Sequence, residues 1–87
     1  MNGVAGYRKV RVFRETTDAI VDMHGNFLYV EVTNNGSSEV DFMPNDFPEQ
    51  GNVGVGIPIA PGTTRVIPMA VYKFTATGPV TVVAYGA

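Results

Sequence analysis

Cysteine and tryptophan are absent from this chain of 87 residues, and histidine occurs once, at position 24. Without cysteine there is no disulfide and no thiolate metal site, and zinc would need carboxylate-rich ligation around His24. No apolar run approaches the roughly 20 residues of a membrane-spanning helix. We therefore expect no cofactor, and we expect association to supply the extra support that so small a domain usually needs.

Positive charge is missing from most of the chain. No Lys or Arg occurs from Glu15 to Thr64, and every Asp and Glu lies between Glu15 and Glu49. Four of the six cations stand in YRKVRVFR, residues 7–14. In one interpretation this segment pairs beside acidic strands of its own molecule, because opposite charges on paired strands stabilise a sheet. In the other, the two regions are complementary surfaces that dock a subunit on another subunit or on a different protein.

Nucleic-acid binding is not expected from this distribution. The net charge is −2, and four cations would neutralise at most about four phosphates. Only Tyr7 and Phe13 interleave with the cations as possible stacking residues. Binding of the segment to a membrane surface is not expected either, because its alternation has the period of a strand and not of an amphipathic helix.

Apolar and polar residues alternate along much of the chain, and helical periodicity is absent. The clearest expected strand covers residues 27–33. Its inward side chains are predicted to be Leu28, Val30 and Val32. The following residues, NNGSS at 34–38, predict a hairpin turn because they accept turn conformations easily.

Other turns and strands follow from glycine and proline. His24-Gly25-Asn26 predicts a tight turn, and Pro61-Gly62 suits the centre of a type II turn. Pro58 and Pro68 cannot donate to a central ladder, so they mark edge strands or strand ends. The terminal stretch VTVVAY, residues 80–85, is apolar on both faces, which predicts a central strand or one covered by a partner.

Seven or eight short strands result, with turn signals about every eight to twelve residues. This pattern predicts a single all-β domain over residues 1–87, an antiparallel β-sandwich or small barrel of immunoglobulin-like or jelly-roll-like type. Residues 1–6 are expected to form a flexible arm. The arm lacks the order of charged and apolar residues that marks a secretory signal, so we expect synthesis in the cytoplasm.

The principal expected loop is MPNDFPEQGNVGVG, residues 43–56. Phe47 is interpreted either as a plug over one end of the sandwich or as an anchor for a partner. Asp46 and Glu49 flank it as further candidate contacts. Carboxylate and amide oxygens between Asp41 and Glu49 could bind calcium, although their spacing misses the EF-hand pattern.

No set of residues in the sequence forms a recognisable catalytic motif. Asp22 and His24 share one face of a strand, so an Asp–His pair is sterically possible, but no Ser or Thr lies in a nucleophile-elbow context. The glycines of residues 51–56 lack the strand and helix of a dinucleotide fingerprint. We expect a protein without enzymatic activity, and a small-molecule ligand is not expected.

The segment VTNNGSSEVDF…GIPIAPGTTRVIPMAVYKFTATGPVTVVAYGA lies within residues 27–87. It resembles the small all-β structural proteins encoded among tailed-bacteriophage head genes. The features in common are general ones, namely a short chain without cysteine, proline-glycine turns and an apolar terminal strand. The resemblance implies a decoration or cement protein, which sits on a capsid shell, often as an oligomer, and stabilises the shell against internal DNA pressure.

We therefore expect a virion structural protein, made in the host cytoplasm, that binds the major capsid protein or another virion protein and forms homo-oligomers. The expected contact residues are Tyr7, Arg8, Lys9, Arg11, Arg14, Asp46, Phe47 and Glu49. Two alternatives stay open. One is a carbohydrate-binding module of a fibre or tip protein, and the other is a small hydrolase that uses Asp22 and His24.

Overall fold

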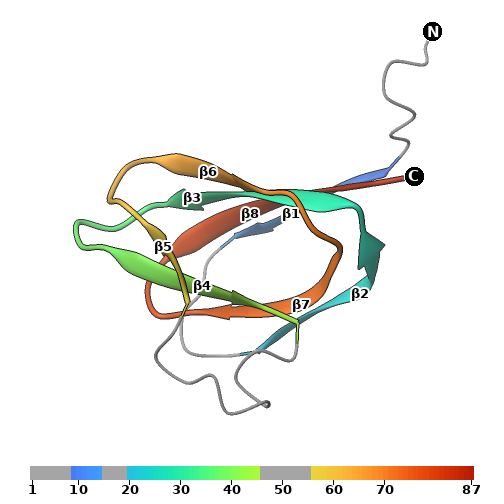
Figure 1. The fold of residues 1–87 in the computed structure, drawn as a ribbon, viewed down its shortest axis with the longest axis horizontal. Helices are drawn as coiled ribbons and strands as arrows, with labels where there is room; N and C mark the ends of the chain where they lie inside the picture. Colours follow the sequence, from blue (N-terminus) through green and yellow to red (C-terminus); the bar gives the residue numbers. More distant parts are fainter. Residues whose placement is uncertain (1–8, 15–19, 46–55) are drawn as a thin grey trace, which may run out of the picture.

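A computed structural model describes residues 9–14, 20–45 and 56–87, which form eight strands in two antiparallel sheets packed face to face (Figure 1). The strands are β1 (Lys9–Arg14), β2 (Val21–Phe27), β3 (Tyr29–Asn34), β4 (Val40–Pro44), β5 (Ile57–Ile59), β6 (Thr64–Ile67), β7 (Val71–Ala76) and β8 (Val80–Gly86). Sheet A has the strand order β1-β8-β3-β6, and sheet B has the order β2-β7-β4-β5. The predicted all-β fold is confirmed, and its form is a small β-sandwich.

Alternate residues of each sheet meet in one core between the two layers. On β8, for example, Val80, Val82 and Ala84 are fully buried, while the residues between them are half-buried on the other side. Removing a valine or phenylalanine side chain from water stabilises the fold by roughly 1.5–3 kcal/mol. The rings of Phe42 and Phe74 pack 5.4 Å apart in this core.

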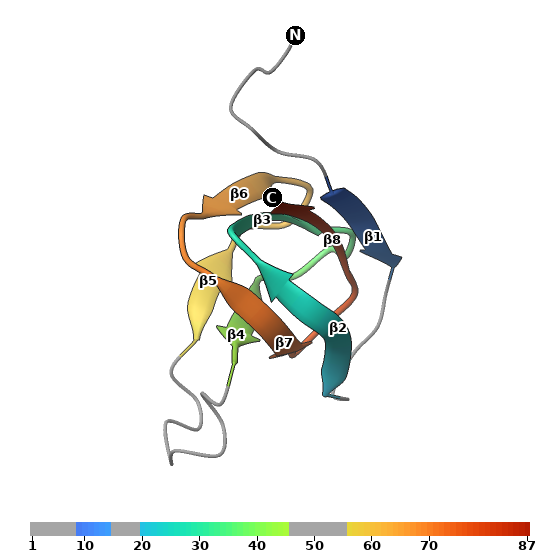
Figure 2. The same ribbon diagram turned by 90° about the vertical axis from the view of Figure 1, so that its right-hand side faces the viewer.

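The sandwich has two lateral edges, and Figure 2 shows them from the end of the molecule. β1 lies over β2 at one edge, and β6 lies over β5 at the other. Phe13 ties β1 to sheet B, because its ring meets the rings of Phe27 and Phe74 edge-on at 6.4 and 6.2 Å. A single aromatic side chain thus anchors the edge strand β1 to the core.

The predicted hairpin at residues 34–38 is wrong. β3 belongs to sheet A and β4 to sheet B, so this segment carries the chain from one sheet to the other. Asn34 is fully buried at the crossing. Its amide donates to the carbonyl oxygens of Ser38 and Ile59 at 2.8 and 2.9 Å, and its side-chain oxygen accepts from the N–H of Gly36 at 2.8 Å. Side-chain hydrogen bonds replace the strand pairing that a hairpin would have.

The predicted sides of residues 27 and 28 are also wrong. Phe27 is buried, whereas 51% of Leu28 is exposed. The chain leaves sheet B at the end of β2 and enters sheet A at Tyr29. Strict alternation holds only within one strand, so the change of sheet reverses the pattern that the sequence suggested. Val30 and Val32 are buried as predicted.

His24-Gly25-Asn26 is not a turn between two strands but an irregular part of β2. The pairing of β2 with β7 shifts register between Asp22 and Phe27. His24 adopts a φ of 56°, and its N–H donates to the Asp22 carboxylate at 2.8 Å. The turn-forming residues therefore build a bulge, which bends the strand without ending it.

The predictions for Pro58, Pro68 and the Pro61-Gly62 turn are confirmed. Pro58 lies in β5, an edge strand, and Pro68 directly follows β6, which is also an edge strand. Gly62 has a φ of 73°, and the N–H of Thr63 donates to the carbonyl of Ala60, as a type II turn requires. The terminal strand β8 is central in sheet A, between β1 and β3.

Candidate interaction face

The outward side chains of sheet A form rows that cross its strands. One row holds Val10, Tyr85 and Tyr29; the next holds Val12, Val83, Glu31 and Val66; the third holds Arg14, Thr81, Thr33 and Thr64. We call these residues, together with Leu28 and Pro68 beside the first row, the outer face of sheet A. Two rows are largely apolar, and the third is polar.

The apolar side chains of this face are unusually open to solvent. Val10, Val12, Leu28 and Val66 keep exposed fractions of 57, 49, 51 and 50%. A lone exposed valine is ordinary on a protein surface. Here the strand register places the exposed side chains in neighbouring rows, and a contiguous apolar surface of this kind is typical of an interaction site.

Two tyrosines form the centre of the first row. The rings of Tyr29 and Tyr85 stack at 4.8 Å with an angle of 14° between their planes. The Tyr85 hydroxyl donates to the Glu31 carboxylate at 2.8 Å. This hydrogen bond, with partial desolvation and the negative charge of Glu31, raises the pKa of Tyr85 above its usual 10.0. The Tyr85 hydroxyl is therefore held by Glu31 and keeps its proton at physiological pH.

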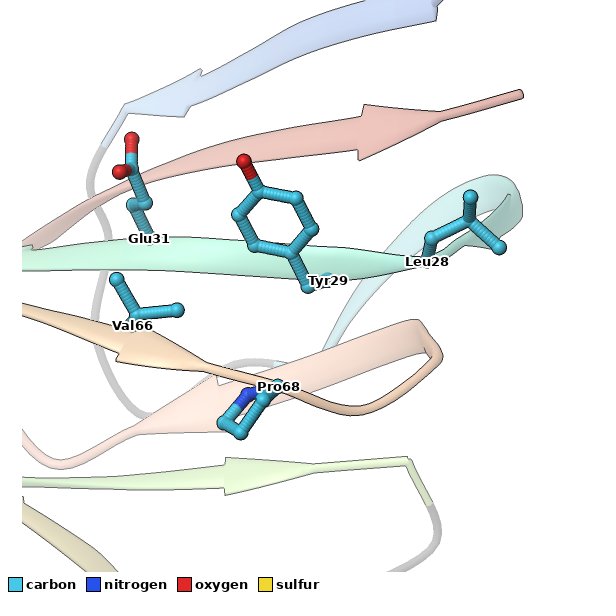
Figure 3. Close-up of a pocket in the computed structure, with 5 residues that line it drawn as sticks. All are labelled: Leu28, Tyr29, Glu31, Val66 and Pro68. Carbon is cyan, nitrogen blue, oxygen red and sulfur yellow. The ribbon is translucent and has the colours of Figure 1, made fainter. Parts of the chain in front are cut away.

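A hollow of about 450 Å³ opens beside the tyrosines (Figure 3). It is lined by Leu28, Tyr29, Glu31, Val66 and Pro68. Figure 3 shows the Tyr29 ring leaning toward β8, with Val66 and Pro68 on the β6 side. The hollow combines an aromatic ring, aliphatic walls and one carboxylate, so it suits an inserted apolar side chain or the face of a sugar ring.

The described cations of the expected interface lie on both sides of β1. Lys9 and Arg11 face sheet B, where the Lys9 ammonium lies 4.7 Å from the centre of the Phe27 ring. Arg14 lies on the outer face of sheet A, in the row with Thr81. Each face of β1 therefore combines cations with apolar residues.

Within the described part of the chain, β1 pairs only with β8, which contains no Asp or Glu. The interpretation that β1 lies beside an acidic strand of its own sheet is therefore wrong for the described residues. Among them, no salt bridge joins Lys9, Arg11 or Arg14 to a carboxylate. The electrostatic surface of β1 remains open to a partner.

The other predicted contact residues, Tyr7, Arg8, Asp46, Phe47 and Glu49, lie outside the described residues, as does the expected arm at 1–6. The strands that flank residues 46–55 are β4 and β5, which are neighbours in sheet B. β1 lies in sheet A, at the lateral edge opposite β5. The described flanks of the loop are thus separated from the basic strand by the width of the sandwich.

The Asp–His pair exists in an exposed form. The Nδ1 atom of His24 lies 3.7 Å from Oδ1 of Asp22, and 78 and 70% of the two side chains are exposed. The Asp22 carboxylate also accepts the His24 N–H, so it shapes the bulge of β2. In the described ranges, no three His, Cys, Asp or Glu residues lie together as a metal site, and no helix has the length and apolarity to cross a membrane.

Sequence reasoning missed most of the outer face of sheet A. Tyr29, Val66 and Tyr85 are far apart in the chain, and only the pairing of β3 with β6 and β8 brings them together. One signal did point there, because the terminal strand is apolar on both faces. That signal could not name the neighbours of β8, since strand order does not follow from periodicity.

Comparisons with protein-family models, with curated protein sequences and with solved structures find no match to this chain.

Proposed function

We propose that the protein is a non-enzymatic structural protein that decorates and stabilises a bacteriophage capsid through protein–protein contacts. The outer face of sheet A and the basic strand β1 make these contacts with the major capsid protein. The protein acts in the virion, as an oligomer, after synthesis in the host cytoplasm. The observation that carries the proposal is the outer face of sheet A, where exposed valines lie beside a pair of stacked tyrosines.

The composition of this face supports binding to a protein. Interface cores are enriched in aromatic residues, and their rims are polar. Tyr29 and Tyr85 form an aromatic centre, and Val12 and Val66 flank it. The threonines of the third row and Arg14 form a polar margin. The arrangement offers a rigid, largely apolar surface that a complementary shell protein can cover without repacking the sandwich.

Binding to the shell tests the proposal directly. The protein would be incubated with expanded capsids of the phage whose genome encodes it, and co-sedimentation would measure bound copies. Val66→Lys places a charge at the β6 end of the second row, opposite Glu31. We expect it to weaken binding about tenfold or more, because the ammonium group must lose its water when a partner covers the face, and a pair with Glu31 offsets that cost only in part. Thr75→Lys is the matched control, because it adds the same charge to the outer side of β7 in sheet B.

The proposal fails if the wild-type protein remains monomeric and does not bind the capsids. It also fails if Thr75→Lys weakens binding as much as Val66→Lys, because the outer face of sheet A would then have no special role. The gene's surroundings give an independent check. Adjacent genes for a portal and a major capsid protein are expected.

A second candidate function is carbohydrate binding by a fibre or tip module. The hollow beside Tyr29 favours it, because an aromatic ring and the Glu31 carboxylate could engage the apolar face and the hydroxyl groups of a sugar. A glycan array separates the two candidates. Specific glycan binding that Tyr29→Ala abolishes would favour the carbohydrate function over the capsid function.

A further inference from the structure

β1 is an edge strand with a regular backbone. All six of its residues pair with β8 in unbroken antiparallel register, from Lys9 opposite Gly86 to Arg14 opposite Thr81. No strand of the described chain lies on its other side. An edge of this kind offers backbone N–H and C=O groups to an incoming strand. We propose that β1 accepts an extended acidic segment of another protein as an added strand of sheet A.

The side chains of β1 define what that segment must look like. Lys9 and Arg11 project on the side that faces sheet B, and Val10 and Val12 project on the outer face. A paired strand sets its own alternate residues beside these two groups. Acids therefore belong at every second position, next to the cations, and apolar residues belong between them, next to the valines. The partner is an alternating acidic and apolar strand.

Two of the three described cations of β1, Arg11 and Arg14, are exposed, and the third, Lys9, lies over the Phe27 ring. Within the described residues, Arg11 and Arg14 make no salt bridge. Arg65, on the opposite edge strand β6, contrasts with them, because its guanidinium donates to the Pro58 carbonyl of sheet B at 2.9 Å. One lateral edge thus uses its cation to join the two sheets, and the other edge presents cations to solvent.

A second copy of the chain does not fit this edge through its own β1. An antiparallel pair sets residues of the same face opposite each other, so a pair of β1 strands centred on Arg11 would place Arg11 against Arg11. Like charges directly opposite each other destabilise a sheet. A pair centred on Val12 would place Arg14 against Val10 and Arg11 against Phe13, and it would give the cations no acid. The chain's own alternating segment of this type, Glu39 to Phe42, is already used, because β4 pairs with β5 and β7 in sheet B. The partner is therefore a different protein.

Charged residues on an edge strand also have a purely protective role, because they discourage unwanted pairing. That role accounts for Lys9 and Arg11 but not for Val10 and Val12, whose side chains are about half exposed. A strand that only repels others has no need of apolar side chains on its outer side. The cations disfavour basic strands, and the valines favour strands with apolar side chains. Together they select one kind of partner strand.

This inference rests in part on the proposed function, because the shell protein would be the natural source of the acidic strand. The test does not require the shell. The full chain would be titrated with the synthetic peptide Ac-TEVEVET-NH2, and the amide signals and hydrogen exchange of β1 would be followed by NMR. Ac-TKVKVKT-NH2 has the same apolar residues and the opposite charge. A third peptide, N-methylated at alternate residues of the acidic sequence, cannot complete the ladder.

We expect the acidic peptide to bind and to slow exchange of β1 amides at least about tenfold, because a new ladder protects them. The lysine peptide and the N-methylated peptide should not bind. Arg11→Glu should weaken binding about tenfold, since an attraction becomes a repulsion across the pair. Arg65→Glu is the charge-matched control and should leave binding unchanged, because Arg65 lies on the opposite edge strand.

The inference is overturned if the acidic peptide does not bind, if the N-methylated peptide binds equally well, or if the shifted amides lie outside β1. These outcomes leave the capsid proposal intact, because Val66→Lys tests that proposal on β6, the edge strand of sheet A opposite β1. Conversely, if the chain binds the acidic peptide at β1 but does not bind capsids, the inference is supported and the proposed function is contradicted.

Discussion

The outer faces of the two sheets differ in chemistry although their inner faces are alike. Sheet A carries exposed valines and stacked tyrosines on its outer side. The outward positions of sheet B include four polar residues, Asp22, Lys73, Thr75 and Asp41, and three others, Met43, Pro58 and Tyr72, of which Tyr72 is 38% exposed. Folding alone requires only the inner faces, which close one core. The apolar outer side of sheet A therefore needs another explanation, and association supplies one.

The same contrast separates stability from binding. Substitutions at the inner faces and at the corners between sheets should unfold the protein, and substitutions on the outer face of sheet A should spare the fold and weaken association. Sheet B provides the control position, Thr75, for the tests of binding.

Asn34→Ala should lower the free energy of unfolding by about 3 kcal/mol, because it removes one buried and two partly buried hydrogen bonds and leaves their backbone partners unsatisfied. Urea unfolding measures the change. Asn35→Ala is the matched control, because Asn35 is exposed and its amide donates only to the Thr81 hydroxyl. A loss below about 1 kcal/mol is expected for it. Equal losses would contradict the role of Asn34 as the buried joint between the sheets.

Alanine substitutions at two glycines compare the packing between the two sheets with the packing at the β1 edge of sheet A. A Cβ added at Gly78, between β7 and β8, would lie 2.6 Å from the Val40 side chain, and one added at Gly86 would lie 2.6 Å from Cε of Lys9. Buried Val40 cannot move, so Gly78→Ala should cost about 2 kcal/mol. Gly86→Ala should cost less, about 1 kcal/mol, because the Lys9 chain can turn away and the other close contact, with Cδ1 of the buried Phe27 ring, is longer at 3.3 Å.

Thermal and urea unfolding of the two variants, measured side by side, check this prediction. Both glycines are buried, and the first contact in each case is equally close, so burial alone predicts similar losses. A larger loss for Gly86→Ala would mean that β1 is held as tightly as the core, and the picture of an adaptable edge would be wrong.

Val83→Thr tests the outer face of sheet A with a smaller change. Val83 is half-buried on β8, in the row of Val12 and Glu31. Replacing a methyl group by a hydroxyl keeps the strand and should lower stability by no more than about 1 kcal/mol. Capsid binding, measured by co-sedimentation, should weaken severalfold. Thr75→Val makes the reverse change on sheet B and should leave capsid binding unchanged. Stronger capsid binding by this variant would contradict the different roles of the two outer faces.

The smallest effect concerns pH. The pKa of Tyr85 is raised in the folded protein, first by its hydrogen bond to Glu31. A raised pKa stabilises the fold fully below the unfolded value of about 10, and this contribution is lost as the pH rises through the folded pKa. Glu31→Gln removes the negative charge, so the pKa of Tyr85 should fall toward 10.

NMR titration of ring-labelled tyrosine measures this change, and Tyr72 serves as the internal reference because it lies on sheet B. The expected result is a lower pKa for Tyr85 in the variant and little change for Tyr72. An unchanged pKa of Tyr85 would show that the hydrogen bond to Glu31 does not hold in solution.

Much of the fold could be predicted from local patterns. Val40 and Phe42 are buried as alternation requires, and Pro58 lies on an edge strand because its nitrogen cannot donate. Errors arose where the chain changes sheets. At Leu28 and at residues 34–38, the local pattern is that of a continuing strand or a hairpin, but the partner of each strand is chosen by distant residues.

The candidate site divides in the same way. The cations of β1 and their alternation with valines could be read from YRKVRVFR without any structure. The stacking of Tyr29 on Tyr85 and the hollow at Val66 could not, because they depend on strand order in sheet A. Residues 46–49 remain predicted contacts, and they lie outside the described residues.

By itself, the sequence determined that the chain is all-β, that the terminal strand is apolar on both faces, and that positive charge gathers at one strand. Each of these follows from the period and composition of a few consecutive residues. Tertiary structure alone decided that β1 lies at an edge beside β8, and that β3, β6 and β8 bring their outward apolar residues together. The reason is physical, because side-chain alternation is a local property, whereas strand pairing is chosen by the packing of the whole core.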